Sequence, residues 1–312
     1  MRALITGISG FVGGSLTSQL VSSQWEVAGF DHREQQTKSE ITIGNIQDRE
    51  AVSDAINKTQ PDVIFHLAGV IKSKSLKDYY NAHILGTLSL FEAIVESGYK
   101  PRVIIASSSA VYGSGFGKRP ISEHFALRPV TDYAISKLGQ EMVARRFFLA
   151  NGIPVIIVRT FNLIGPGQSP ELACSAFARQ IAIDEIQTHT RPIRTGNLSA
   201  KRDFVDVRDA AYAYELLARN GTSGSTYNVC SGQAVSIQNC LNTLLRMATK
   251  QLTTEFDKSR MQKNDVPTQV GNAKLIEHAV GWQPKISIEQ SLADLLIDWR
   301  MRIKSSTENS HV

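Results

Sequence analysis

The stretch Arg2-Ala3-Leu4-Ile5-Thr6-Gly7-Ile8-Ser9-Gly10-Phe11-Val12-Gly13 decides the fold. Its first residues, 2–6, are β-rich, and apolar side chains recur at helical spacing after Gly13. The pattern predicts a strand, a glycine turn and a helix. In a dinucleotide-binding turn the first glycine permits the tight bend, the second admits a pyrophosphate and the third lets helix approach strand. The amides at the start of the helix would face the phosphate charge.

Alternation of strand and helix patterns continues downstream. Strands are expected near 25–30, 41–43, 63–67 and 101–106, and the last is nearly all apolar, as parallel strands covered on both faces are. We therefore expect an α/β fold, a doubly wound parallel (Rossmann) sheet with a smaller interleaved α/β substrate-binding lobe. The expected dinucleotide-binding domain covers 1–161 with return segments near 201–232, the lobe covers 162–200 and 233–303, and a polar tail covers 304–312.

Several residues at the ends of these strands are candidate cofactor contacts. Asp31 can accept hydrogen bonds from adenosine ribose hydroxyls, which slightly favours NAD(H), whereas His32 and Arg33 could pair with a 2′-phosphate and keep NADP(H) open. Asn45-Ile46 is placed to meet adenine, and the small residues that follow Leu67, namely Ala68 and Gly69, leave room for the cofactor.

Composition excludes several classes of function. The chain has 312 residues, 42% hydrophobic and 20% charged, with a net charge of +5 whose lysines and arginines are scattered, so we expect no nucleic-acid partner. No apolar run approaches a membrane span and no leader-like segment opens the chain, so we expect no membrane partner and a cytoplasmic location. Cys174, Cys230 and Cys240 lack metal-ligand spacing, so we expect no metal.

Tyr133 and Lys137 are four residues apart, which stacks a phenol and an ammonium on one face of a helix. A nearby cation favours tyrosinate, so this phenol is expected to exchange a proton with a sugar or alcohol oxygen. Ser107, Ser108 and Ser109 close a predicted strand at the edge where open α/β sheets bind ligands. Serines there also serve as caps for the next turn.

These motifs together resemble the extended short-chain dehydrogenase/reductase family, in its nucleotide-sugar branch. The resemblance rests on four segments and covers nearly the whole chain: Thr6 to Gly13, Phe65-His66-Leu67-Ala68, Ser107 to Gly113, and Tyr133-x-x-x-Lys137. The segments Gly196-Asn197-Leu198 and Tyr227 to Gly232 look most like GDP-6-deoxy-D-mannose (GDP-4-keto-6-deoxy-D-mannose) reductases.

The resemblance implies a role for each matching residue. Tyr133 is implied to donate the proton, Lys137 to bind nicotinamide ribose and lower the pKa of the phenol, and Ser108 to hydrogen-bond the 4-keto oxygen. The remaining implied contacts are Thr160 and Phe161 with nicotinamide, and Ser109, Asn162, Arg202 and Arg260 with the substrate. The implied reaction is NAD(P)H-dependent reduction of the 4-keto group of GDP-4-keto-6-deoxy-D-mannose, by a homodimer joined through helices that flank the sheet.

Three departures from the family pattern bear on function. Related 4,6-dehydratases carry a carboxylate just after the serine position, where this chain has Ser109 and Ala110, so elimination lacks an evident agent. Gln262 replaces a usual arginine, which leaves Arg260 or Lys263 to reach the diphosphate. His83 replaces a usual asparagine, and we expect it to be a hydrogen-bonded core histidine.

Two other functions remain as alternatives. A nucleotide-sugar 4-epimerase would use the same serine, tyrosine and lysine but retain NAD tightly. A non-catalytic dinucleotide sensor would need the fold but not Ser108, Tyr133 and Lys137 together.

Overall fold

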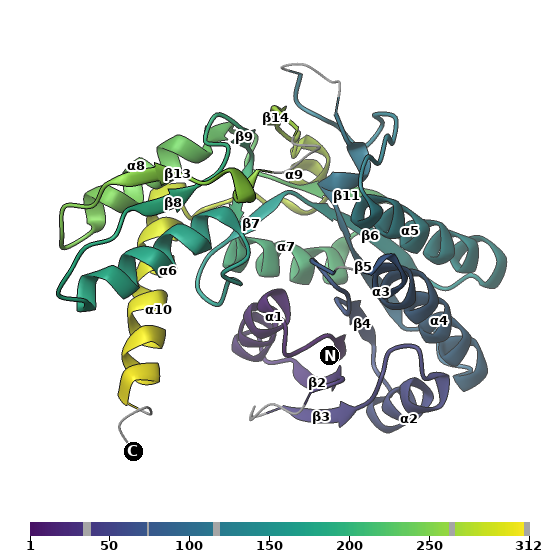
Figure 1. The fold of residues 1–312 in the computed structure, drawn as a ribbon. Coiled ribbons are helices and arrows are strands. Elements are labelled where there is room, and N and C mark those ends of the chain that lie inside the picture. Colours follow the sequence, from purple (N-terminus) through teal and green to yellow (C-terminus); the bar gives the residue numbers. More distant parts are fainter. Residues whose placement is uncertain (34–38, 74, 115–118, 262–265, 309–312) are drawn as a thin grey trace.

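A sheet of seven parallel strands forms the centre of the protein (Figure 1). The computed structural model describes residues 1–33, 39–73, 75–114, 119–261 and 266–308. The strand order is β11 (Thr226–Val229), β6 (Val155–Thr160), β5 (Arg102–Ser108), β4 (Val63–His66), β1 (Arg2–Thr6), β2 (Glu26–Asp31) and β3 (Glu40–Ile43). The order reverses between β1 and β4, which creates the crevice where doubly wound sheets bind ligands. The predicted fold class is confirmed.

Helices cover both faces of this sheet, so each strand buries both of its sides. One face carries α1 (Phe11–Ser22), α7 (Val207–Asn220) and α9 (Lys274–Val280), and the other carries α2 (Arg49–Thr59), α4 (Gly86–Ser97) and α5 (Asp132–Asn151). Strand β6 shows the alternation: Ile156 and Val158 belong to the first core, Val155 and Ile157 to the second. This explains why its sequence is continuously apolar from Val155 to Val158.

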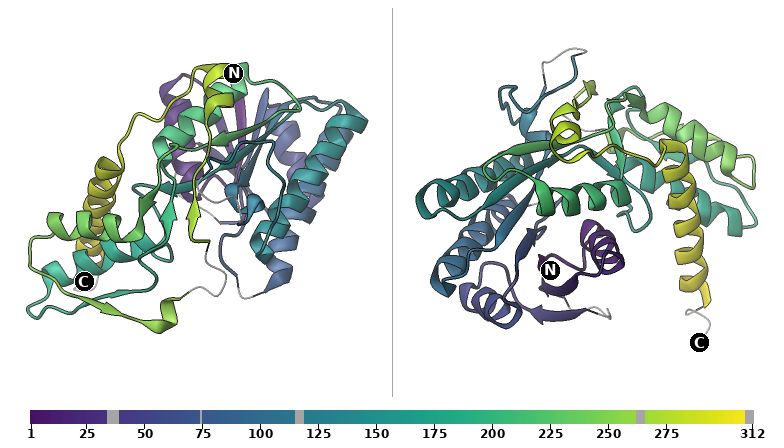
Figure 2. Two further views of the ribbon diagram at one scale, coloured as in Figure 1. Left: turned by 90° about the horizontal axis from the view of Figure 1, so that it is seen from above. Right: turned by 180° about the vertical axis from the view of Figure 1, so that it is seen from behind.

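A smaller lobe lies to one side of the sheet (Figure 2). Its separate core joins α6 (Ala173–Ile186), α8 (Ile237–Met247) and α10 (Ile288–Glu308). Short strands connect it: β7 (Asn162–Ile164) pairs β10 (Phe204–Asp206), β8 (Ile193–Thr195) pairs β13 (Thr254–Phe256), and β9 (Lys201–Arg202) lies between β12 (Val235–Ser236) and β14 (Thr268–Gln269). None of the helices in the part of the chain that the structure describes has the length and apolarity needed to cross a membrane.

The boundary between the halves differs from the sequence expectation. Residues 226–229 join the main sheet as expected, but 201–207 does not, because it divides into β9 and β10, each paired with a lobe strand. Residues 274–282, expected in the lobe, cover the main sheet because Ile276 and Trp282 are fully buried in its first core.

The chain end also differs from the expectation. The polar tail expected from residue 304 is helical as far as Glu308. Its serines suit a helix here because Ser305 and Ser306 return hydrogen bonds to the carbonyls of Met301 and Ile303, at 3.1 and 2.8 Å.

Local signals fix both ends of α5. The Thr131 side chain accepts the Ala134 amide at 3.2 Å and caps the start, and Gly152, with φ of 67°, ends the helix in the left-handed conformation. Tyr133 therefore stands in the first turn.

A buried ion pair locks α5 to the sheet. The Arg159 guanidinium on β6 grips the Glu141 carboxylate on α5 with two bonds of 2.9 and 2.7 Å, and both side chains are almost fully buried. Ser107 on β5 donates to the same carboxylate at 2.5 Å, and Arg159 donates to the Tyr112 hydroxyl at 3.1 Å. The ends of β5, β6 and α5 are therefore held in one arrangement behind the crevice.

We expect Arg159→Met to lower the free energy of unfolding by about 3–5 kcal/mol, because it leaves the Glu141 carboxylate buried without its cation. Urea unfolding measures the change. The control is Arg49→Met, which removes an exposed pair with Glu96 at 3.0 Å and should cost about 1 kcal/mol or less. A similar small loss for both variants would contradict the prediction.

Candidate functional site

A cavity of about 340 Å³ opens at the carboxyl ends of β1, β2 and β4. It gathers most of the predicted cofactor contacts from separate elements: Gly7, Gly10, Asp31, His32, Arg33, Asn45, Ile46, Leu67, Ala68 and Gly69. In the sequence these residues are up to 62 positions apart, from Gly7 to Gly69, and the reversal of strand order brings them together.

The glycine turn fits a nicotinamide dinucleotide. Gly7 has φ of 75°, and a Cβ there would lie 2.8 Å from the Ala68 amide nitrogen, so no larger residue fits. A Cβ on Gly13 would lie 2.4 Å from the Gly7 carbonyl oxygen, so only glycine lets α1 come this close to the turn. The N-terminus of α1 then faces the position of a pyrophosphate.

The Asp31 carboxylate is turned toward the protein. One oxygen accepts the Ser9 amide at 3.0 Å, and the other accepts the Arg33 amide at 3.3 Å and lies 3.1 Å from His32 Nδ1. Asp31 is only 4% exposed, whereas the His32 side chain is 67% exposed. Asp31 therefore braces the glycine turn as well as lining the cavity.

Other predicted cofactor residues lie outside this cavity. Phe11 lines a different one beside Gly167, and Val12 is partly buried near the start of α1. Thr160 is buried and its hydroxyl lies 3.1 Å from that of Tyr214. The Phe161 side chain packs in a small core beside Tyr112, with ring centroids 6.4 Å apart, and its predicted contact with nicotinamide stays a prediction.

The three serines at the end of β5 have different hydrogen-bond partners. Ser107 donates to Glu141 behind the sheet, and the buried Ser109 donates to Gln269 at 3.1 Å. Of the three, Ser108 is the serine that acts on the Tyr133 phenol, whose pKa it lowers, and it also caps the following turn by accepting the Ala110 amide at 3.2 Å. The predicted substrate contact of Ser109 stays a prediction, and its hydroxyl proton is directed to Gln269 of β14.

The phenol of Tyr133 does not have the low pKa that the sequence suggested. Burial raises its pKa, the hydrogen bond from Ser108 acts in the opposite direction, and Tyr79 raises it further. Desolvation penalises the tyrosinate more than its neighbours stabilise it. Tyr133 therefore holds its proton near neutral pH.

Lys137 is buried on the same helix and its amine is hydrogen-bonded to the Ala106 carbonyl at 2.8 Å and to Gln140 Oε1 at 3.0 Å. Burial lowers its pKa from 10.5 to about 7, although Glu141 opposes the change. A Cβ built on Gly69 would lie 3.6 Å from this amine, which places Lys137 at the wall of the cofactor cavity.

A chain of hydrogen bonds connects Lys137 to the glycine turn. Gln140 Nε2 donates to the Thr87 hydroxyl at 3.1 Å, which itself donates to the His83 carbonyl at 2.6 Å. His66 Nε2, 2.9 Å from Thr87, must therefore be a donor, and its Nδ1 accepts from Thr6 at 2.8 Å. Burial and Lys137 lower the pKa of His66 to about 3, which matches this neutral tautomer.

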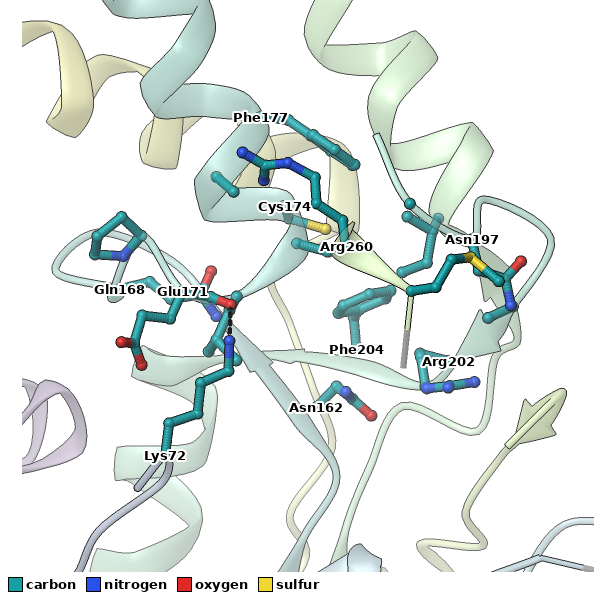
Figure 3. A pocket seen from close by; sticks show the side chains of 18 of the residues that line it. Lys72, Asn162, Gln168, Glu171, Cys174, Phe177, Asn197, Arg202, Phe204 and Arg260 are labelled. Carbon is teal, nitrogen blue, oxygen red and sulfur yellow. Dashed lines mark hydrogen bonds between the residues drawn. The ribbon is translucent and has the colours of Figure 1, made fainter. Parts of the chain in front are cut away.

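A second cavity of about 630 Å³ lies between the sheet and the lobe (Figure 3). Three predicted substrate residues line it: Asn162, Arg202 and Arg260. Arg202 donates to the Val266 carbonyl at 2.5 Å, and Arg260 lies 3.4 Å from the Asp257 carboxylate. Gln262 and Lys263, the departure and the alternative considered for the diphosphate, lie outside the described residues.

The structure adds residues to this cavity that the sequence did not indicate. Phe177 on α6 and Asn197 line it, and Lys72 enters from the cofactor half, with its amine 2.6 Å from the Glu171 carbonyl oxygen (Figure 3). Lys72 lies in an irregular loop with no periodic pattern, so no local signal marked it. Within the described ranges, no three or more His, Cys, Asp or Glu side chains gather closely enough to hold a metal ion.

Comparisons with known proteins agree with this geometry. Residues 4–295 match the family described as GDP-mannose 4,6 dehydratase. The chain is 31% identical to GDP-6-deoxy-D-mannose reductase of Pseudomonas aeruginosa, over 97% of this chain and 98% of that protein. It is 27% identical to GDP-6-deoxy-D-talose 4-dehydrogenase of Aggregatibacter actinomycetemcomitans, over 90% and 92%. A solved structure of RMD from P. aeruginosa complexed with NADPH matches with a TM-score of 0.86 and 31% identity, covering 96% of this chain and 99% of that one.

We expect Lys137→Met to remove a pH dependence of stability. In the unfolded chain this amine keeps the ordinary pKa of 10.5, and in the fold its pKa is about 7, so between these values the unfolded chain binds more protons. The free energy of unfolding of the natural protein, relative to the variant, should therefore rise with pH by up to about 1.4 kcal/mol per unit in that window. Urea unfolding from pH 6.5 to 9.5 measures the difference, and a flat difference would mean that the amine titrates normally.

Proposed function

The chain belongs to the GDP-mannose 4,6-dehydratase family of NAD(P)-dependent nucleotide-sugar enzymes, and on that premise we propose that it is a reductase. The proposed reaction reduces the 4-keto group of GDP-4-keto-6-deoxy-D-mannose to GDP-6-deoxy-D-mannose. The main support is that Ser108 lies close enough to the Tyr133 phenol to favour its charged form, while no carboxylate follows the serine. Elimination by a dehydratase needs such a group to move a carbon-bound proton, and carbonyl reduction does not.

The proposed mechanism gives each polar group one task. The reduced nicotinamide, when bound, supplies the hydride to C4 of the sugar. Tyr133 gives its hydroxyl proton to the oxygen at C4, a role that suits a phenol whose burial keeps it protonated. Ser108 donates a hydrogen bond to the same oxygen and stabilises its developing charge. Lys137, at the wall beside Gly69, would hold the nicotinamide ribose.

The proposed substrate site is the cavity between the halves. Lys72, Arg202 and Arg260 bring positive charge to it, and Asn162 brings an amide, which suits a sugar joined to a diphosphate. The guanine base is inferred from the two bacterial relatives, whose names specify GDP-sugars.

We propose that the protein accepts NADPH as well as NADH. The slight preference for NAD(H) rested on Asp31, but its two oxygens already accept protein donors. His32 and Arg33 line the same cavity and suit a 2′-phosphate.

We also propose a homodimer formed through α4 and α5. Apolar side chains on these helices are exposed to an unusual extent for surface positions, notably Val95, Met142 and Leu149.

The reaction can be tested directly by incubating the protein with GDP-4-keto-6-deoxy-D-mannose and either reduced cofactor, and identifying the product by NMR. We expect GDP-6-deoxy-D-mannose to form in proportion to the cofactor oxidised, with both NADPH and NADH. A purified protein that carries stoichiometric NAD and interconverts nucleotide sugars without added reductant would identify a 4-epimerase instead. Binding of NADPH without oxidation by any keto sugar would favour a sensor.

We expect Tyr133→Phe to lower kcat by about 10²- to 10⁴-fold, because the proton donor is lost while the ring remains. The Kd for NADPH, measured by nicotinamide fluorescence, should change little. Tyr99→Phe, a partly exposed tyrosine beyond α4, serves as the control and should leave kcat unchanged. Full turnover by the Tyr133 variant would exclude the proposed proton donor.

A further inference from the structure

Three aromatic rings meet beside the catalytic helix. Tyr79 of α3 (Leu76–Tyr80) and His83 of the π-helical turn η1 (Asn81–Leu85) both contact the ring of Tyr133. The His83 and Tyr133 centroids lie 5.7 Å apart at 77°, and those of Tyr79 and Tyr133 lie 6.1 Å apart at 69°. These are edge-to-face contacts, which fix the tilt of a ring as well as burying it.

Hydrogen bonds determine the protonation of His83. The Val70 amide donates to Nε2 at 3.1 Å, so Nε2 carries no proton. The Ser136 hydroxyl donates to the Tyr133 carbonyl at 2.8 Å, so His83 Nδ1, 2.7 Å from that hydroxyl, must donate to it. His83 is fully buried, as expected, and burial, Lys137 and His66 lower its pKa to about 2. The neutral ring thus ties the turn of α5 that carries Tyr133 to the backbone at residue 70.

The loop formed by residues 69–73 is held by the same rings. Its first part, Gly69 and Val70, lines the cofactor cavity, and Lys72 lines the substrate cavity. A Cβ on Gly69 would lie 2.6 Å from His83 Nε2, so the loop rests directly on the imidazole. The Tyr79 hydroxyl accepts the Ser73 amide at 2.8 Å and lies 3.4 Å from the Ile71 carbonyl oxygen, to which it can donate.

We propose that His83 and Tyr79 are positioning residues that set loop 69–73 against the catalytic helix. His83 orients Tyr133 relative to the cofactor cavity, and Tyr79 places the part of the loop that carries Lys72 at the substrate cavity. This inference rests on the proposed function, because it takes Tyr133 as the proton donor of a reductase. Neither side chain itself touches the reacting atoms in this assignment.

Four variants separate these roles. His83→Leu removes both hydrogen bonds of the ring. His83→Asn places an amide near the position of Nδ1 and keeps the bond to Ser136. His83→Gln places an amide near the position of Nε2 and keeps the bond to Val70. Tyr79→Phe retains the ring and removes only the hydroxyl that holds the loop. Tyr99→Phe is again the matched control.

We expect His83→Leu to lower kcat by about 10- to 100-fold, as a displaced proton donor does. His83→Asn should recover part of kcat. Loss of the bond to Val70 should raise the Kd for NADPH, and His83→Gln, which keeps that bond, should restore the natural Kd. Tyr79→Phe should raise KM for the sugar nucleotide by about two- to tenfold and leave kcat nearly unchanged. A merely structural role would lower the unfolding temperature of each variant without this division between kcat, KM and Kd.

A folded His83→Leu protein with kcat and Kd within about twofold of the natural values would overturn the inference. If that variant does not fold, natural values of kcat and Kd for both His83→Asn and His83→Gln would overturn it. If the natural protein fails to reduce GDP-4-keto-6-deoxy-D-mannose, the proposed function fails. NADPH binding to the same variants still tests the contact of His83 with the loop in that case, because it requires no sugar.

Discussion

The site depends on one buried amine, that of Lys137, whose hydrogen bonds go to protein acceptors. Lys137 makes these bonds with the Ala106 carbonyl of β5 and with Gln140 of its own helix, and the bond to β5 forms only when α5 lies at one height along the sheet. The bonds beyond Gln140 pass through Thr87 and His66 and end at Thr6, where the glycine turn begins. Because these buried groups are hydrogen-bonded to one another across several elements, a shift of one element leaves a polar group buried and unpaired.

The need to hold α5 at one position explains why polar residues are buried at the carboxyl ends of β5 and β6. Behind the crevice, Glu141 and Arg159 replace apolar side chains that would have packed at least as stably. They connect three elements through directional bonds, which apolar packing cannot do with the same precision. The core of the lobe is built mainly around apolar residues of three helices, with a few buried bonds such as that from Trp299 to the Ser175 hydroxyl.

Much of the fold and part of the site could be predicted from the sequence. Glycine spacing and apolar runs follow from local backbone geometry. They therefore predicted the opening strand, turn and helix and the parallel sheet correctly. The orientation of individual side chains could not be predicted, because the partners of Ser109 and Phe161, namely Gln269 and Tyr112, are distant in sequence. The predicted low pKa of Tyr133 was wrong for a similar reason. Helical spacing reveals the neighbouring amine, but it does not reveal the burial of the phenol, which raises the pKa.

The chain passes more than once between the main sheet and the lobe, and this has a consequence for biosynthesis. The first core of the main sheet includes Trp282, and the core of the lobe includes Trp299, so neither is complete until almost the entire polypeptide has been made. As the nascent chain leaves the ribosome, the early strands β1, β4 and β5 emerge before α9, the last helix that covers them. One apolar face of these strands therefore stays partly uncovered until α9 has been made. The two halves therefore mature together, and premature termination yields chains that are substrates for chaperones and proteases rather than a working fragment.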